Sequence, residues 1–137
     1  MSLKVLVHAQ AAHVRLAIVD GLRGVAEVVH AGDDPIKALR ASRADVVLVA
    51  LRRRDRRPTL ALARRIKTDG RQPPLVALID PSGVLSDPAL ACERTEADGC
   101  LQGPIDAAGL SELLAGLCVA GATVVGEAPG GWGLLRR

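Results

Sequence analysis

Apolar runs alternate with amphipathic stretches along most of the chain. Five short runs are apolar enough to predict β-strands, at residues 3–9, 25–31, 44–51, 73–79 and 99–103. After each run, apolar residues recur at helical spacing, which predicts helices at residues 12–24, 33–42, 58–70, 86–97 and 105–119. A strand followed by a helix is therefore expected five times in succession.

Residues at the predicted boundaries support these helices. The stretches at 33–42 and 86–97 both open with an Asp-Pro pair. The Asp side chain can cap free backbone N–H groups, and Pro occupies a position that needs no donor. Pro58 opens the third helix, while Gly24 and Gly70 are typical of helix ends.

This alternation predicts an α/β fold, with a parallel sheet, helices on both faces and right-handed crossovers. Residues 44–51 are apolar almost throughout, as expected for a strand that is covered on both faces. Five strands favour the flavodoxin-like (βα)5 architecture with strand order 2-1-3-4-5, whose crevice lies beyond the carboxyl ends of the strands. We expect this domain to span residues 3–119.

The pattern changes at about residue 120, where the chain continues as GATVVGEAPGGWGLLRR. Glycine and proline become frequent there, and neither the strand period nor the helix period continues. We therefore expect residues 120–137 to form a Gly/Pro-rich linker or tail.

The composition is that of one globular domain. The chain has 137 residues, 49% of them hydrophobic, which is enough for a core without metals or disulfides. It has no Phe or Tyr and one Trp, so Leu, Val, Ile and Ala must fill that core. Since no signal sequence and no run long enough to span a membrane are present, we expect a soluble, cytoplasmic protein.

Charge and cysteine content indicate no particular partner. The net charge of +3 is mild and does not by itself indicate nucleic-acid binding. Three scattered cysteines, Cys92, Cys100 and Cys118, are too few for a disulfide scaffold or a zinc site. They fit small buried thiols in a reducing compartment, with a redox switch as the alternative. We expect no metal and no cofactor.

Four segments resemble the receiver domain of bacterial response regulators, the CheY-like family. KVLVHAQ resembles its first strand, ADVVLVAL its third and PPLVALID its fourth, and ADGCLQGPID resembles the fifth strand with the loop after it. The order and spacing agree over residues 3–118. The resemblance implies a module of two-component signal transduction, which receives a phosphoryl group from a kinase histidine on an aspartate.

The residues that this phosphoryl transfer requires are missing. The chemistry needs a carboxylate nucleophile, an acidic pair for Mg²⁺, and a hydroxyl and a lysine for the phosphoryl oxygens. In the resemblance, these positions fall on Ala50 for the nucleophile, Ala9 and Gln10 for the acidic pair, Ile79 for the hydroxyl and Gly103 for the lysine, while Pro104 is kept. We therefore expect a degenerate receiver with no catalytic residue and no enzyme activity.

No other aspartate is expected to replace the missing nucleophile. Asp45 lies at the opposite end of its strand, and Asp55 lies beyond the arginines that follow it. Asp33 and Asp34 are placed to cap a helix, and Asp80 follows Ile79 near the crevice. None of the five lies beside both an acidic pair and a lysine.

Five arginines follow the third predicted strand: Arg52, Arg53, Arg54, Arg56 and Arg57. We favour a solvated loop. The first alternative is an anion or nucleotide site, because the run flanks the crevice and a helix start and because Arg52 and Asp55 have an Arg-x-x-Asp spacing. DNA contact is the least favoured, since no recognition helix or interleaved aromatic residues accompany the run.

Three histidines lie near the expected crevice. His8 and His30 end neighbouring strands, and His13 begins the first helix. A pH-sensing or metal-binding cluster is conceivable. We favour separately tolerated side chains.

Residues 111–125 resemble the end of receivers that precede a LuxR-type helix-turn-helix domain. We therefore expect a phosphorylation-independent module that regulates an output, with transcription as the favoured output. It would act through a protein partner or a homodimer, by the surface of helix 86–97, strand 99–103 and helix 105–119. DNA contact would need an output domain outside this chain. The alternative is a small-molecule or nucleotide sensor that uses the vacated crevice.

Overall fold

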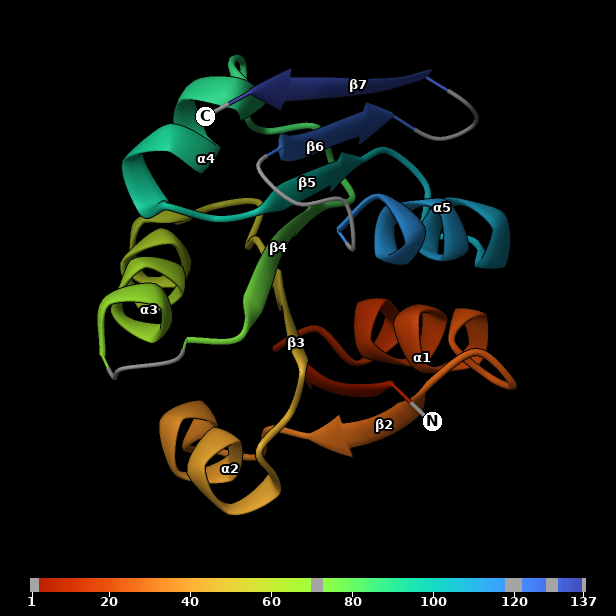
Figure 1. Cartoon of the computed structure of the whole chain (residues 1–137), viewed down its shortest axis with the longest axis vertical. Coiled ribbons are helices and arrows are strands. Elements are labelled where there is room, and N and C mark those ends of the chain that lie inside the picture. Colours follow the sequence, from red (N-terminus) through yellow and green to blue (C-terminus); the bar gives the residue numbers. More distant parts are fainter. Residues whose placement is uncertain (1–2, 70–72, 118–121, 128–130, 137) are drawn as a thin grey trace.

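One sheet of seven strands forms the centre of the molecule, in the order β2-β1-β3-β4-β5-β6-β7 (Figure 1). The computed structural model describes residues 3–69, 73–117, 122–127 and 131–136. The strands are β1 (Lys4–His8), β2 (Glu27–His30), β3 (Val46–Ala50), β4 (Leu75–Asp80), β5 (Gly99–Gln102), β6 (Ala122–Glu127) and β7 (Gly131–Arg136). The flavodoxin-like fold and the order 2-1-3-4-5 of its first five strands are confirmed.

Five helices cover the sheet on both faces. They are α1 (Ala12–Gly21), α2 (Pro35–Ser42), α3 (Arg57–Thr68), α4 (Pro88–Thr95) and α5 (Ala107–Leu117). Figure 1 shows α1 and α5 together on one face, and α2, α3 and α4 in a row on the other. Each predicted helix is present, with ends that differ from the sequence pattern by a few residues.

The Asp-Pro pairs cap helices as predicted. Asp34 accepts a hydrogen bond from the Lys37 amide at 3.1 Å, and Asp87 accepts one from the Leu90 amide at 3.0 Å. In both helices the proline occupies the first turn, where its missing N–H has no cost. The sequence did not indicate that Asp106 caps α5, where it accepts from the Gly109 amide at 2.7 Å.

The core consists of aliphatic side chains in two layers, one on each face of the sheet. Side chains alternate along a strand, so Val46, Leu48 and Ala50 of β3 pack in the layer beneath α1 and α5. Val47 and Val49 pack in the layer beneath α2, α3 and α4. Every residue of β3 is buried, as expected for a strand covered on both faces.

The segment predicted to be a linker or tail contains two strands of the same sheet. β6 pairs with β5 in parallel, and β7 pairs with β6 in antiparallel orientation. The sequence pattern missed them because glycines interrupt both strands, and glycine weakens the apolar period that marks a strand. The sheet thus extends beyond β5 (Figure 1).

Candidate functional site

The carboxyl ends of β1, β3, β4 and β5 meet at one edge of the sheet. Ala50 lies opposite Ile79 in the pairing of β3 with β4, and Ile79 lies opposite Leu101 of β5. Ala9 directly follows β1, and Gly103 directly follows β5. The structure thus brings together the positions that a receiver uses for phosphoryl transfer.

Apolar side chains occupy this edge. Ala9, Ala50 and Ile79 are all buried, and all three belong to the apolar layer beneath α1 and α5. Gln10 is exposed beside them. The described part of the edge thus offers no acidic pair for Mg²⁺ and no carboxylate at the end of β3.

The backbone at Gly103 also differs from what a lysine would need. Its φ is 90°, in the left-handed region that residues with a Cβ rarely adopt. Its amide donates to the Asp80 carbonyl at 3.1 Å, which fixes the turn after β5. A lysine at this position would therefore need a different conformation of the loop. Pro104 follows, exposed.

Asp80 ends β4 at this edge, near the crevice as expected, but its side chain does not face the apolar layer that contains Ile79. Its side chain is fully buried and points to the other side of the sheet from Ile79. Its carboxylate accepts from the amides of Val84 and Leu85, both at 3.0 Å, and from Gln102 Nε2 at 2.8 Å. Asp80 therefore holds the loop between β4 and α4.

Of the other four aspartates considered as replacements, three accept hydrogen bonds elsewhere, and the fourth lines a neighbouring cavity. Asp45 accepts from the Lys4 amide at the opposite edge of the sheet, at 2.9 Å. Asp55 accepts from the Arg57 amide, Asp34 caps α2, and Asp33 lines a separate cavity. Within the described residues, no three His, Cys, Asp or Glu side chains could together hold a metal ion.

A cavity of about 620 Å³ lies over the edge at which Ala9, Ala50, Ile79 and Gly103 meet, here named the vacated edge. Its floor includes Ala9, Ala50 and Val14, and Arg52, Arg53 and Arg54 line one side of it. The remaining lining residues come from the loops after β1, β3 and β4 and from the first turn of α1, and they are Gln10, Ala11, His13, Leu51, Pro81 and Ser82. Ser82 brings the only hydroxyl among these lining residues, and the sequence pattern did not indicate it, because Ser82 lies three positions beyond Ile79.

The arginine run divides between two surfaces. Arg52, Arg53 and Arg54 are exposed along the cavity. Arg56 instead lines a groove between α3 and α4, and Arg57 pairs with Asp55 at 3.5 Å on the surface. The run is therefore not one continuous patch, and only its first three members can meet a ligand in the crevice.

A second cavity, of about 430 Å³, adjoins the first through Ala9 and Gln10, which line both. It contains His8 and His30, with Arg15 and Asp33. Burial lowers the pKa of His8 below its ordinary value of 6.5. The structure thus brings His8 and His30 to one cavity, whereas His13 lines the other.

Cys92 of α4 and Cys100 of β5 are both buried in the core layer between the sheet and α2, α3 and α4. A hydrogen bond with the Cys92 side chain, together with burial, raises the pKa of Cys100. Both features favour the protonated thiol, which is a poor nucleophile. Cys118 lies outside the described residues.

The β5 edge is not open, because β6 pairs with it from Gly99 to Gln102. The surface predicted to bind a partner therefore has β6 lying along its central strand. Among the described helices, none is both long and apolar enough to cross a membrane.

Solved structures that match this fold include response regulators and isolated receiver domains. A response regulator from Thermotoga maritima has a TM-score of 0.72 and 21% identity, over 85% of this chain and 98% of that one. Chemotaxis response regulator CheY4 of Vibrio cholerae has a TM-score of 0.68 and 15% identity, over 85% of this chain and 99% of CheY4. NtrX from Brucella abortus has a TM-score of 0.70 and 21% identity over 84% of this chain, which spans only 26% of NtrX.

Neither a protein-family model nor a curated protein sequence matches the chain. The likeness to solved structures shows that the chain has the fold of CheY-like receiver domains. At these identities it shows the fold alone.

Proposed function

We propose that the chain is a receiver-like module of signal transduction that works without aspartyl phosphorylation. It has no enzyme activity of its own, acts in the cytoplasm, and regulates an output through contact with a protein partner or with a second copy. The output we favour is transcription, through a DNA-binding domain that is not part of the described residues.

The vacated edge of the sheet carries this proposal. Phosphoryl transfer needs a nucleophile at the end of β3 and a metal to offset the charge of the phosphoryl group. Ala50 has a methyl group at the first position, and Ala9 and Gln10 supply no acidic pair for the second. The nearest buried carboxylate, Asp80, is held by three donors on the far side of the strand.

The likeness to response regulators supports the signalling part of the proposal. NtrX is a longer protein of which the matching region is about a quarter, consistent with a receiver that acts on attached domains. Since the same scaffold is kept here while its chemistry is absent, the surfaces of the fold remain as its means of action.

A titration with Mg²⁺ and beryllofluoride, which mimics a bound phosphoryl group, tests the proposal. We expect no saturable change in the NMR amide signals of Ala9, Ala50 and Gly103. An aspartate-containing receiver domain, titrated in parallel, must show such changes. Saturable shifts at these three amides would overturn the proposal, since they require an Mg²⁺-dependent anion site at this edge.

The cavity over the vacated edge favours a second candidate function, a sensor of an anionic small molecule or nucleotide. The apolar floor at Ala9 and Ala50 can take an aromatic or aliphatic group, and Arg52, Arg53 and Arg54 can take the anionic group. A thermal-shift screen of nucleotides and metabolites tests it. A hit that Arg53→Ala abolishes supports the sensor, and no stabilisation by any compound argues against it.

A further inference from the structure

A groove of about 360 Å³ lies between α3 and α4. These helices cover the opposite face of the sheet from the apolar layer that contains Ala9, Ala50 and Ile79. The neighbouring turns of the two helices and the loop before α4 form it. The lining residues are Arg56, Leu60, Ala61, Arg64, Leu85, Ser86, Asp87, Leu90, Ala91, Arg94 and Thr95.

The floor of the groove is apolar. Leu60 is half-buried and Leu85 is buried, so both present an edge to the groove. Leu90 is 37% exposed, which makes it one of three large hydrophobic side chains that stand out in the described part of the chain. Ala61 and Ala91 add small side chains that leave room between the helices.

The rim of the groove is basic. Arg56, Arg64 and Arg94 are all exposed, and Arg64 Nη1 donates to the Arg94 carbonyl at 3.4 Å, which links α3 with α4. Asp87 is the only acidic lining residue. Its carboxylate already accepts from the Leu90 amide at the start of α4. Three cations thus face one carboxylate that is engaged as a helix cap.

The groove opens on the side of α4 that faces α3. On its other side α4 contacts β5 and β6, and β6 occupies the edge of β5. A partner that docks between α3 and α4 therefore meets the leucines and arginines of the groove.

We propose that this groove binds an acidic amphipathic helix of a partner protein. Leucine or isoleucine on one face of that helix would pack on Leu60, Leu85 and Leu90, as in other helix-in-groove complexes. Glutamate or aspartate along its flanks would pair with Arg56, Arg64 and Arg94. The inference rests on the proposed function, since it names the surface and the kind of partner for a module that acts by protein contact.

The test uses the full chain and a labelled synthetic peptide of four helical turns. The peptide has Leu at positions i, i+3, i+4 and i+7 of its apolar face and Glu at the positions beside it. A second peptide has Lys in place of each Glu. We expect saturable fluorescence anisotropy with the acidic peptide, weakening as salt is added, and no binding of the basic one.

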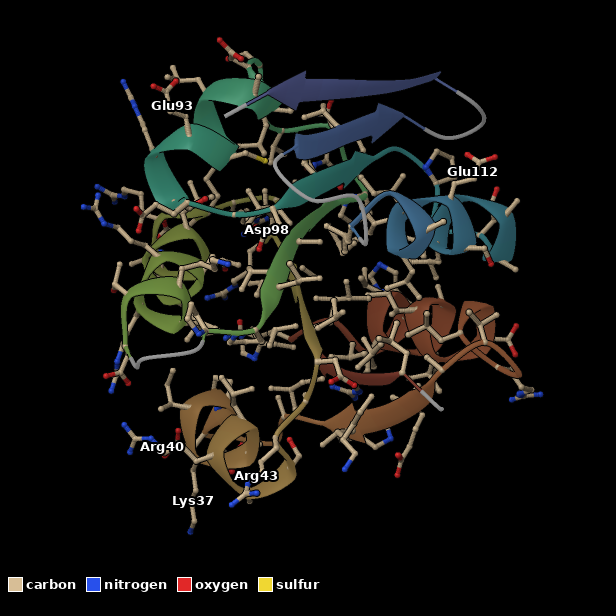
Figure 2. The ribbon with its side chains drawn as sticks, in the orientation of Figure 1. Lys37, Arg40, Arg43, Glu93, Asp98 and Glu112 are labelled. Atoms are coloured by element: carbon tan, nitrogen blue, oxygen red, sulfur yellow. The ribbon has the colours of Figure 1, made fainter. Side chains whose placement is uncertain are left out.

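Three variants locate the site. Leu90→Glu, and the double variant Arg64→Glu with Arg94→Glu, should each weaken binding of the acidic peptide at least tenfold. Lys37→Glu is the matched control, because Lys37 is exposed on α2, and Figure 2 shows it far from α4 and its Glu93. Circular dichroism must show that all three variants stay folded, as expected for exposed positions.

Three results would overturn the proposal: no saturable binding at millimolar concentration, equal binding of both peptides, or equal affinity of the arginine variant and Lys37→Glu. Concentration-dependent self-association that Leu90→Glu abolishes would also overturn it, since the occupant would then be a second copy. Each of these leaves the phosphorylation-independent function standing, because that function is tested at Ala9, Ala50 and Gly103, none of which lines this groove.

Discussion

At the scale of single residues, the neighbours Ile79 and Asp80 of β4 have different roles, because successive side chains of a strand point to opposite faces of the sheet. Ile79, at the position where the resemblance to receivers expects a hydroxyl, is buried in the apolar layer beneath α1 and α5. Asp80, one residue later, faces the opposite side and receives three hydrogen bonds. The carboxylate of Asp80 therefore follows Ile79 along the chain but faces away from the layer that Ile79 belongs to.

Replacement of Asp80 tests this structural role. Asp80→Ala leaves buried amides of the loop without an acceptor, so the free energy of unfolding should fall by about 3 kcal/mol. Asp55→Ala, at an exposed ion pair, should change it by less than about 1 kcal/mol. Urea denaturation of both variants provides the measurement, and equal stabilities would show that Asp80 does not hold the loop.

His8 makes stability depend on pH. Its lowered pKa means that the folded state favours the neutral imidazole, while the unfolded chain titrates near 6.5. This contribution is complete above the unfolded pKa and is lost as the pH falls from that value through the lower pKa of the folded state. The free energy of unfolding should therefore decline below about pH 6.5.

His8→Gln should remove part of that decline, because the neutral amide does not titrate. His13→Gln is the control, since His13 is exposed. Arg15, His30 and Asp33 share the His8 cavity and stay unchanged in both variants. Denaturation curves at several pH values give the slopes, and identical slopes for wild type and His8→Gln would refute the role of His8.

At the scale of elements, an ion pair fastens α3 to the sheet at the edge opposite the crevice. Lys67 Nζ lies 2.8 Å from Asp98 Oδ2, and both side chains are largely buried. Figure 2 shows Asp98 between α3 and the strands. Asp98 also accepts from the Val76 amide of β4 at 2.9 Å, so one carboxylate joins a helix to two strands.

Removal of that carboxylate should be strongly destabilising. Asp98→Ala leaves the Lys67 ammonium buried without its partner, which lowers the free energy of unfolding by about 3–5 kcal/mol. Asp69→Ala breaks the exposed pair with Arg40 and should lower it by less than about 1 kcal/mol. Thermal and urea unfolding compare the two, and a similar small loss in both would contradict a buried anchor.

At the scale of the whole molecule, periodicity predicted the five strand–helix units because each element buries one face or both in an aliphatic core. The caps Asp34 and Asp87 were also predictable from the sequence, because an Asp-Pro pair favours a helix start through contacts within a few residues. What stayed hidden depends on contacts between distant residues. The positive φ of Gly103 and the place of Ser82 on the cavity are set by loops, and the donors to Asp80 come from the loop before α4 and from Gln102 of β5.

The strands β6 and β7 were hidden for a different reason. A strand that adds to an existing edge gains backbone hydrogen bonds from its neighbour, so it needs no strong side-chain period of its own. Glycines at 126, 131 and 133 masked what period there was. These two strands also bear on function, because they cover the β5 edge, whereas the groove between α3 and α4 stays open.

The central claim is that this receiver fold does not accept a phosphoryl group, and mass spectrometry of the intact protein tests it most directly. The chain is incubated with acetyl phosphate and Mg²⁺, beside an aspartate-containing receiver domain as a positive control. The account predicts a phosphorylated control and an unchanged mass for this chain. A stoichiometric phosphate adduct on this chain that hydroxylamine removes, as it removes an acyl phosphate, would contradict the account.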